Sequence, residues 1–169
     1  MSDATFEEGR ERPLRLIARD AEDLKVISAL VQDAVLTGVD LRFDSRRRRF
    51  TLLVNRFRWE DQRGAVAQGQ DFERVRALLD FADVRTARHQ GLEGRDADTV
   101  LSLLSLSWEP APEAESVAPD APAGPGRVTL VFSGDGAIAL DVECLEVQLC
   151  DVTRPYAAPS GRAPAHRTD

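Results

Sequence analysis

An arginine-rich stretch is the part of this sequence with the clearest chemical potential. It runs from Leu41 to Glu60, LRFDSRRRRFTLLVNRFRWE, and places Phe57 and Trp59 among arginines. Between residues 42 and 63 there are eight arginines and three carboxylates, so the stretch carries a charge of +5 in a chain whose net charge is −7. Guanidinium groups bind phosphates and carboxylates, and an arginine beside an aromatic ring can stack on an unpaired base.

Two interpretations fit this stretch. In one, it is an exposed interaction surface, whose candidate residues are Arg46, Arg47, Arg48, Arg49, Arg56, Arg58 and Trp59. In the other, the consecutive arginines cap a solvated β-hairpin, while Arg56 and Arg58 cover apolar rings or pair with carboxylates across a sheet. The second is favoured because the chain as a whole is acidic and is repelled by phosphate backbones.

Residues suited to catalysis or metal binding are sparse. A serine or cysteine nucleophile needs a base within hydrogen-bond reach, and the only histidines are His89 and His166. Cys144 and Cys150 do not form a Cys-x-x-Cys pair, which argues against a zinc site of the usual spacing. Other candidates fit structural roles better: Ser102, Ser105 and Ser107 along a strand, Asp80 and Asp83 on a solvated face. We therefore expect no catalytic residue, no metal and no cofactor.

The composition predicts a soluble, cytoplasmic protein. The N-terminus, MSDATFEEGRERP, lacks the charged start and apolar stretch of a signal peptide. No apolar run approaches the ~20 residues that span a bilayer. Two cysteines do not make a disulfide framework, and the net negative charge predicts no contact with anionic membranes.

A helix is the first element expected to support the arginine-rich stretch. Asp20 has the character of an N-cap, and Thr37-Gly38 is expected to end the helix. The apolar positions between them share one face, which predicts that the helix lies on a sheet: Leu24, Ile27, Leu30, Val31, Ala34 and Val35. A strand over residues 14–18 is expected before it.

The arginine-rich stretch itself is predicted to be a β-hairpin with its turn at residues 44–48. Apolar residues within Phe50–Val54 fall on one face of the outgoing strand, but Phe57 and Trp59 fall on the other. Because successive side chains of a strand alternate between faces, both sets cannot enter one core. Either a bulge near Asn55 or a strand covered on both faces would resolve this conflict.

The rest of the chain is mostly predicted as strand. Residues 72–89 fit both an alternating strand and a helical stripe, and we choose strand because the segment VRTARH alternates. Segments 127–132 and 137–142 are expected to form a hairpin through the turn SGDG. The apolar spacing over 142–152 predicts a short helix beginning near Cys144.

Residues 109–126, EPAPEAESVAPDAPAGPG, are acidic and rich in proline. This composition predicts a flexible loop, and the strands after it are too few to fold alone, so we expect an excursion between strands of one domain. That domain covers residues 13–154, with disordered termini at 1–12 and 155–169. The predicted fold class is α+β, with a curled, barrel-like antiparallel sheet of about seven strands.

Four segments together are similar to a known family: LRLIARDAEDLKVISALVQDAVL, RRRFTLLVNRFRWE, VLSLLSLSWEP and VTLVFSGDGAIALDVECLEVQLCD. They resemble a bacterial family, mostly alphaproteobacterial, known as domain-of-unknown-function family 2948. The similarity covers Leu14 to Asp151, and its most specific element is NRFRWE. The resemblance implies a small, cytoplasmic, one-domain protein, and it brings no activity, cofactor or catalytic residue.

Three functions are compatible with the sequence. The leading hypothesis is a non-enzymatic module that binds another protein or a second copy of itself, because Trp, Phe and Arg are enriched in interface cores. The second is an RNA-binding accessory domain that uses the hairpin from Arg42 to Trp59. The third is a curled sheet that encloses a small-molecule pocket.

Overall fold

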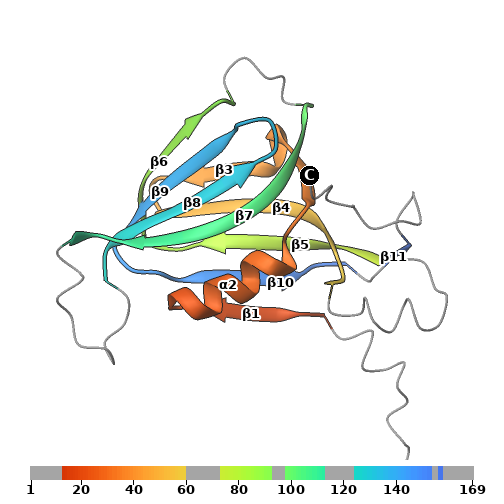
Figure 1. Ribbon diagram of the computed structural model, residues 1–169, viewed down its shortest axis with the longest axis horizontal. Helices are drawn as coiled ribbons and strands as arrows, with labels where there is room; N and C mark the ends of the chain where they lie inside the picture. The colour runs from red at the N-terminus through yellow and green to blue at the C-terminus, as the bar shows by residue number, and fades with distance from the viewer. Residues whose placement is uncertain (1–12, 60–72, 93–97, 113–123, 154–155, 158–169) are drawn as a thin grey trace, which may run out of the picture.

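The computed structural model describes residues 13–59, 73–92, 98–112, 124–153 and 156–157. In these residues the fold is one antiparallel sheet of eleven strands with a single α-helix (Figure 1). The elements are β1 (Arg15–Ala18), α2 (Ala21–Leu30), β2 (Ala34–Thr37), the 3₁₀ turn η1 (Gly38–Asp40), β3 (Leu41–Asp44), β4 (Arg49–Phe57), β5 (Glu73–Phe81), β6 (Val84–Gln90), β7 (Val100–Pro110), β8 (Gly126–Phe132), β9 (Ala137–Val142), β10 (Val147–Asp151) and β11 (Tyr156–Ala157).

The strand order along the sheet is β1-β10-β5-β4-β2-β7-β8-β9-β6, with β3 added beside β4 and β11 beside β5. One edge of β4 is therefore shared, because β3 pairs with its first half while β2 meets it at Asn55. The sheet curls so that β7, β8 and β9 pass over β4 and β5 (Figure 1). Helix α2 packs against both β7 and β1, and so covers the opening between them.

The antiparallel sheet and the single main helix are confirmed, but three details of the predicted fold class are wrong. The sheet has eleven strands where about seven were expected, since several are only two to five residues long. The pairing path ends at β1 and β6, so the described strands do not close into a barrel. The segment after Cys144 is strand β10, whose pairing with β1 and β5 overrides the helical spacing.

Helix α2 begins as predicted and ends early. The Asp20 side chain accepts a hydrogen bond from the backbone N–H of Asp23 at 2.8 Å, which caps the first turn. The helix stops at Leu30, and Asp33 adopts a left-handed conformation with φ 62°. The apolar residues that follow, Ala34–Thr37, therefore form β2 instead of a last helical turn.

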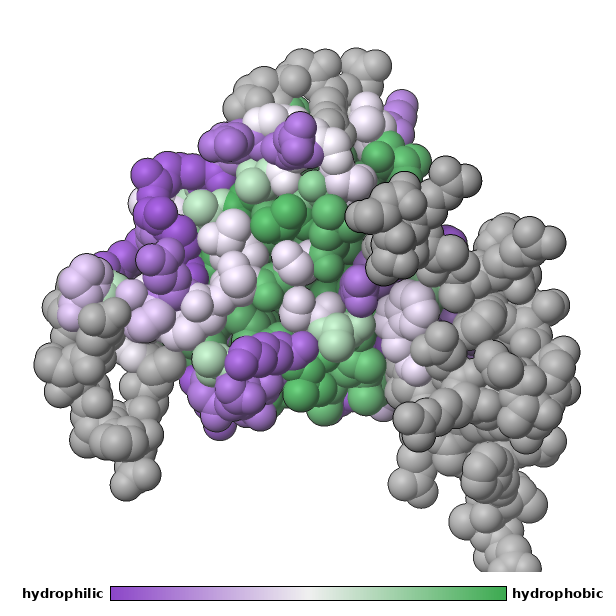
Figure 2. All heavy atoms as spheres, in the orientation of Figure 1, coloured by the Kyte–Doolittle hydropathy of each residue, from purple (hydrophilic) through white to green (hydrophobic). Residues whose placement is uncertain are grey.

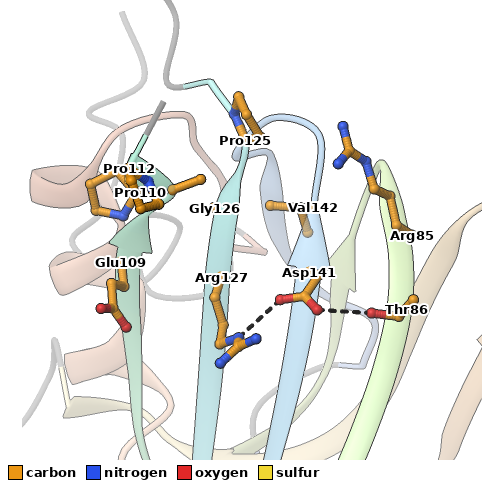
Figure 3. A pocket seen from close by; sticks show the side chains of 11 residues that line it. Arg85, Thr86, Glu109, Pro110, Pro112, Pro125, Gly126, Arg127, Asp141 and Val142 are labelled. Carbon is orange, nitrogen blue, oxygen red and sulfur yellow. Dashed lines mark hydrogen bonds and ion pairs between the residues drawn. The ribbon is translucent and has the colours of Figure 1, made fainter. Parts of the chain in front are cut away.

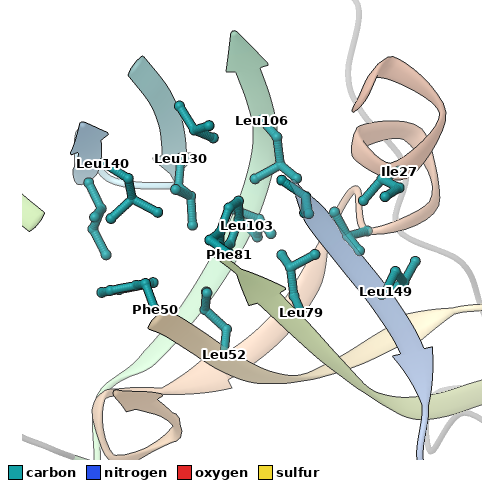
Figure 4. Packing of buried hydrophobic residues seen from close by; sticks show 14 of the residues in the cluster. Ile27, Phe50, Leu52, Leu79, Phe81, Leu103, Leu106, Leu130, Leu140 and Leu149 are labelled. Atoms are coloured by element: carbon teal, nitrogen blue, oxygen red, sulfur yellow. The ribbon is translucent and has the colours of Figure 1, made fainter. Parts of the chain in front are cut away.

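The core lies inside the curled sheet. Side chains from β4 and β5 meet those from β7, β8 and β9, and Ile27 of α2 closes the space beside Leu149 (Figure 4). Most of these side chains are less than 5% exposed, and strand alternation leaves the outward positions more polar. On the face shown in Figure 2, apolar and weakly polar side chains share the middle of the surface, and hydrophilic residues gather at its margin.

The strand prediction for residues 72–89 is confirmed within the described part, as β5 and β6. The register between β4 and β5 runs without a shift from Phe50 to Phe57, so no bulge interrupts this pairing near Asn55. The inward-facing positions of β4 alternate from Phe50 as far as Arg56, which is buried on the core face. Phe57, the next residue, is buried on the opposite face of the strand. Of the two explanations for the two-faced pattern, burial on both faces is therefore correct.

The strands on either side of the acidic, proline-rich segment pair with each other. Glu109 lies opposite Arg127, and the N–H of Ala111 donates to the carbonyl of Pro125 at 2.9 Å. The middle of the segment, 113–123, lies outside the described residues, as do 1–12 and 158–169. Tyr156 and Ala157 form β11 against β5, inside the C-terminal segment that was predicted to be disordered. The division into a single domain with disordered termini stays a prediction.

Within the described ranges, no helix is both long enough and apolar enough to cross a membrane.

Replacement of Asp20 by Ala should lower the free energy of unfolding by about 1 kcal/mol, because the first turn of α2 loses its side-chain acceptor. Asp20→Asn is the matched control, since its amide oxygen can still accept from the N–H of Asp23. Urea unfolding followed by circular dichroism measures both variants. Equal stability of Asp20→Ala and the parent protein would contradict the capping role.

Candidate functional site

The predicted hairpin at the arginine-rich stretch is confirmed. Strands β3 and β4 pair from Leu41↔Leu52 to Asp44↔Arg49, and the turn occupies the residues between them. The Asp44 carboxylate accepts from the backbone N–H of Arg47 at 3.2 Å, as acidic residues often do at the start of a turn. Arg48 takes the left-handed conformation that the turn requires, with φ 55°.

A hollow of about 570 Å³ lies on the outer side of this hairpin and the neighbouring strand β5. We call it the arginine hollow, and its lining residues are Arg42, Asp44, Arg46, Arg47, Arg49, Thr51, Leu53 and Leu78. Leu53 and Leu78 are directly opposite each other in the β4–β5 pairing, and both are half-buried. Arginines therefore surround a floor that contains two leucines.

The arginines of the hollow are only partly neutralised. Arg49 donates to Asp80 at 2.6 Å, and Asp80 also accepts from the Thr51 hydroxyl at 3.2 Å. Arg47 and Asp44 are 3.9 Å apart at an exposed position, where such a pair contributes little. Arg42 and Arg46 form no ion pair with any residue that the structure describes. The hollow thus has excess positive charge.

Arg48 does not join this group. Its Nη1 donates to Glu143 at 2.9 Å, and Glu143 also accepts from Arg85. The consecutive arginines are thus divided by the turn, with Arg46, Arg47 and Arg49 lining the hollow and Arg48 directed to the loop after β9. Arg42, on the incoming strand, also lines the hollow; it belongs to the hairpin of the RNA-binding prediction but was not among the seven candidate surface residues.

Arg56 is completely buried. Its Nε and Nη2 atoms donate to the two oxygens of Asp151, each at 2.9 Å, and its Nη1 donates to the carbonyl of Phe57 at 3.1 Å. The side chain of Asp151 is 4% exposed and also accepts from the N–H of Leu14 at 3.0 Å. This two-pronged ion pair joins β4, β10 and the start of β1 at one end of the core.

Arg58 and Trp59, the last described residues of the NRFRWE segment, are also held within the fold. Arg58 is 7% exposed and donates to Glu73 at 2.6 Å. The Trp59 indole N–H donates to the carbonyl of Gln32 at 3.0 Å, and its ring lies 5.4 Å from that of Phe57. The guanidinium of Arg74 lies over the Phe57 ring, 4.3 Å from its centroid.

Arg56 and Arg58 therefore cannot form the exposed surface that was one of the two predictions, whereas the arginines of the hairpin are exposed. The sequence contained a signal for this burial. The inward alternation of Phe50, Leu52 and Val54 continues to Arg56, and that of Val147 and Leu149 continues to Asp151. A basic and an acidic residue that both continue an apolar face indicate a buried pair.

The residues considered for catalysis are not brought together. Asp80 binds Arg49 and Thr51, whereas Asp83 accepts a hydrogen bond from the Cys144 thiol at 2.9 Å. That bond to a carboxylate, together with burial, raises the pKa of Cys144 to about 11. His89 is exposed on β6. Among the described residues, no three His, Cys, Asp or Glu side chains are arranged to hold a metal ion.

Comparison with known proteins identifies the class of this chain. Residues 14–166 match the model of the family described as Protein of unknown function (DUF2948). Since the match covers most of the chain, the chain belongs to that family, which confirms the predicted resemblance. Neither the curated proteins nor the solved structures contain a match.

Removal of one partner of the buried ion pair should strongly destabilise the fold. Asp151→Ala leaves the Arg56 charge buried without the Asp151 carboxylate, so we expect the free energy of unfolding to fall by about 3–5 kcal/mol. Replacement of both residues, with Arg56→Met and Asp151→Leu, removes the buried charges and should recover a large part of that loss. Chemical unfolding of the single and double variants measures the coupling free energy between Arg56 and Asp151. Losses of stability that simply add would contradict the buried ion pair.

The Cys144 thiol should be unreactive near neutral pH. Because its pKa is raised to about 11, the thiolate is scarce below that pH, and the thiolate is the nucleophile. In a Cys150→Ser variant, alkylation by iodoacetamide at pH 8 should be much slower for folded protein than for the same protein in urea. Equal rates in the two states would contradict the Asp83–Cys144 hydrogen bond.

Proposed function

We propose that this protein is a non-enzymatic interaction module and that the arginine hollow binds an acidic segment of a partner protein. The observation that carries the proposal is the excess of arginine over carboxylate in a hollow on the outer sheet face. Arg42 and Arg46 have no ion-pair partner among the described residues, and a partner's Asp or Glu side chains would supply it. Arginine suits this role because its planar group can donate two parallel hydrogen bonds to one carboxylate.

The floor of the hollow favours a peptide over a simple anion. Leu53 and Leu78 offer apolar surface between the arginines. A segment with carboxylates and aliphatic side chains can cover these leucines while it pairs with the guanidinium groups, and apolar burial adds to the binding energy. An inorganic anion would leave the leucines in contact with water.

The RNA-binding alternative loses its aromatic contribution. Single-stranded nucleic acids bind basic surfaces largely by stacking their bases on aromatic rings. Phe57 is 1% exposed, and Trp59 is held by Gln32 against Phe57. No aromatic residue lines the arginine hollow in the described chain. We therefore place RNA second to an acidic protein segment.

The cellular setting belongs to the same proposal. We assign the protein to the cytoplasm of a bacterium, on the strength of the family resemblance and two free cysteines. In that setting a free thiol such as Cys150 stays reduced. Self-association through the same surface is the variant of the proposal in which the acidic segment comes from a second copy.

A fluorescein-labelled poly-glutamate peptide tests this function by fluorescence anisotropy. We expect binding to the full-length protein that weakens as salt is raised, because exposed charges are screened. The double variant Arg42→Gln/Arg46→Gln should bind about 10-fold or more weakly, since it removes two charge-assisted contacts.

The matched control is Arg19→Gln/Arg88→Gln, which removes the same charge from exposed arginines that do not line the arginine hollow. It should change the affinity less than about two-fold. Equal loss in both double variants would mean that only net charge is sensed, and the proposal would fail. Tighter binding of an oligouridine of matched charge would instead favour the RNA alternative.

A further inference from the structure

A second hollow, of about 440 Å³, lies at the far end of β7, β8, β9 and β6 (Figure 3). It is separate from the arginine hollow, since no residue lines both. Its volume is within the usual range for small-molecule sites. We call it the rim pocket. It goes beyond the function proposed above, because it is too small to hold a folded partner.

One side of the rim pocket is apolar and rigid. Pro110, Pro112 and Pro125 stand over it, with Val142 opposite (Figure 3). Gly126 completes this wall, and a side chain at that position would come within 2.5 Å of the Trp108 ring. Trp108 thus packs directly against the Gly126 backbone, so the wall cannot easily shift.

The other side is polar and is organised around Asp141. Its oxygens accept from Arg127 Nε at 2.9 Å, from the Thr86 hydroxyl at 3.0 Å and from Arg88 at 3.0 Å. The hydrogen bond from Arg127, more than any other contact, lowers the pKa of Asp141 below its ordinary value. Asp141 is therefore ionised at neutral pH and holds Arg127 in place (Figure 3).

Two arginines of the rim pocket, Arg85 and Arg127, use only part of their hydrogen-bond donors. Arg127 uses Nε in its bond to Asp141, and Arg85 uses Nε in a bond to Glu143 at 3.3 Å. A guanidinium group carries several more N–H donors on its terminal nitrogens. Those of Arg85 and Arg127 form no hydrogen bond or ion pair with the described residues, although the Glu109 carboxylate opposite Arg127 attracts its guanidinium group. Each arginine is thus oriented by a carboxylate while its terminal nitrogens remain available.

Local charge decides which ligand suits these donors. The cations Arg85, Arg88 and Arg127 are balanced by the anions Glu109, Asp141 and Glu143. A doubly charged phosphate would meet carboxylates without enough positive charge to offset them. A single carboxylate can accept from the free nitrogens, and an apolar body can cover the proline wall.

We propose that the rim pocket binds a small monocarboxylic acid with an apolar body, its carboxylate held by Arg127 and its body packed against the prolines. The match of an arginine oriented by Asp141 with an apolar wall in one hollow carries this assignment. Arg88 helps to hold Asp141 but does not line the pocket.

Titration with benzoate, followed by saturation-transfer NMR on the full-length protein, tests the proposal. We expect a Kd on the order of 1 mM for so small a ligand. Benzyl alcohol, which has the ring without the charge, should bind more weakly. Arg127→Gln should weaken benzoate binding by about 10-fold.

Arg19→Gln is the matched control, because it removes the same charge from an exposed arginine that neither lines the pocket nor contacts Asp141. It should bind benzoate within about two-fold of the parent protein. Thermal unfolding checks that the variants remain folded, and Arg127→Lys, which keeps the charge but lacks the planar group, decides the matter if Arg127→Gln does not fold. Absence of benzoate binding to the parent protein at ~10 mM, or equal loss in Arg19→Gln, would overturn the proposal. The poly-glutamate assay should not respond to benzoate, so each proposal can fail without the other.

Discussion

The buried pair of Arg56 and Asp151 is the contact on which the rest of the structure depends. Removing both groups from water is costly, and the cost is offset only because each prong of the guanidinium meets a carboxylate oxygen and the remaining groups bind backbone. The pair also fixes registers. A slip of one residue in β4 or β10 would turn one charge outward and leave the other alone in the core. The ends of β4 and β10 are thereby held in a fixed register.

The two halves of the arginine-rich stretch have different roles, because the buried pair involves only the second half. In its second half, Arg56, Arg58 and Trp59 are all bound within the fold. In its first half, the turn directs several arginines to one exposed face. The exposed arginines of the hairpin can therefore be changed while the core stays intact, as the proposed binding surface on a rigid support requires.

Much of the fold could be predicted from local patterns, and the failures have physical causes. The start of α2 at Asp20, the hairpin turn and strand β5 each depend on patterns within a few residues. The sequence was therefore sufficient to predict them. The end of α2 depended on Asp33, whose left-handed backbone is imposed by the pairing of β2 with β7. The arginine hollow was found in part, through its consecutive arginines. The rim pocket was missed because register alone brings Thr86, Asp141 and Arg127 together from three strands.

The position of β10 between β1 and β5 has a consequence for how the protein is made. Arg15 lies opposite Cys150, so the first strand has no sheet partner until almost all the described chain has been synthesised. During translation β1 and the outer edge of β5 stay unpaired, and their apolar faces are exposed to aggregation. Long-range pairing of this kind also slows folding. Strand β10, which is synthesised after every other described strand except β11, is thus the one that joins β1 to the sheet.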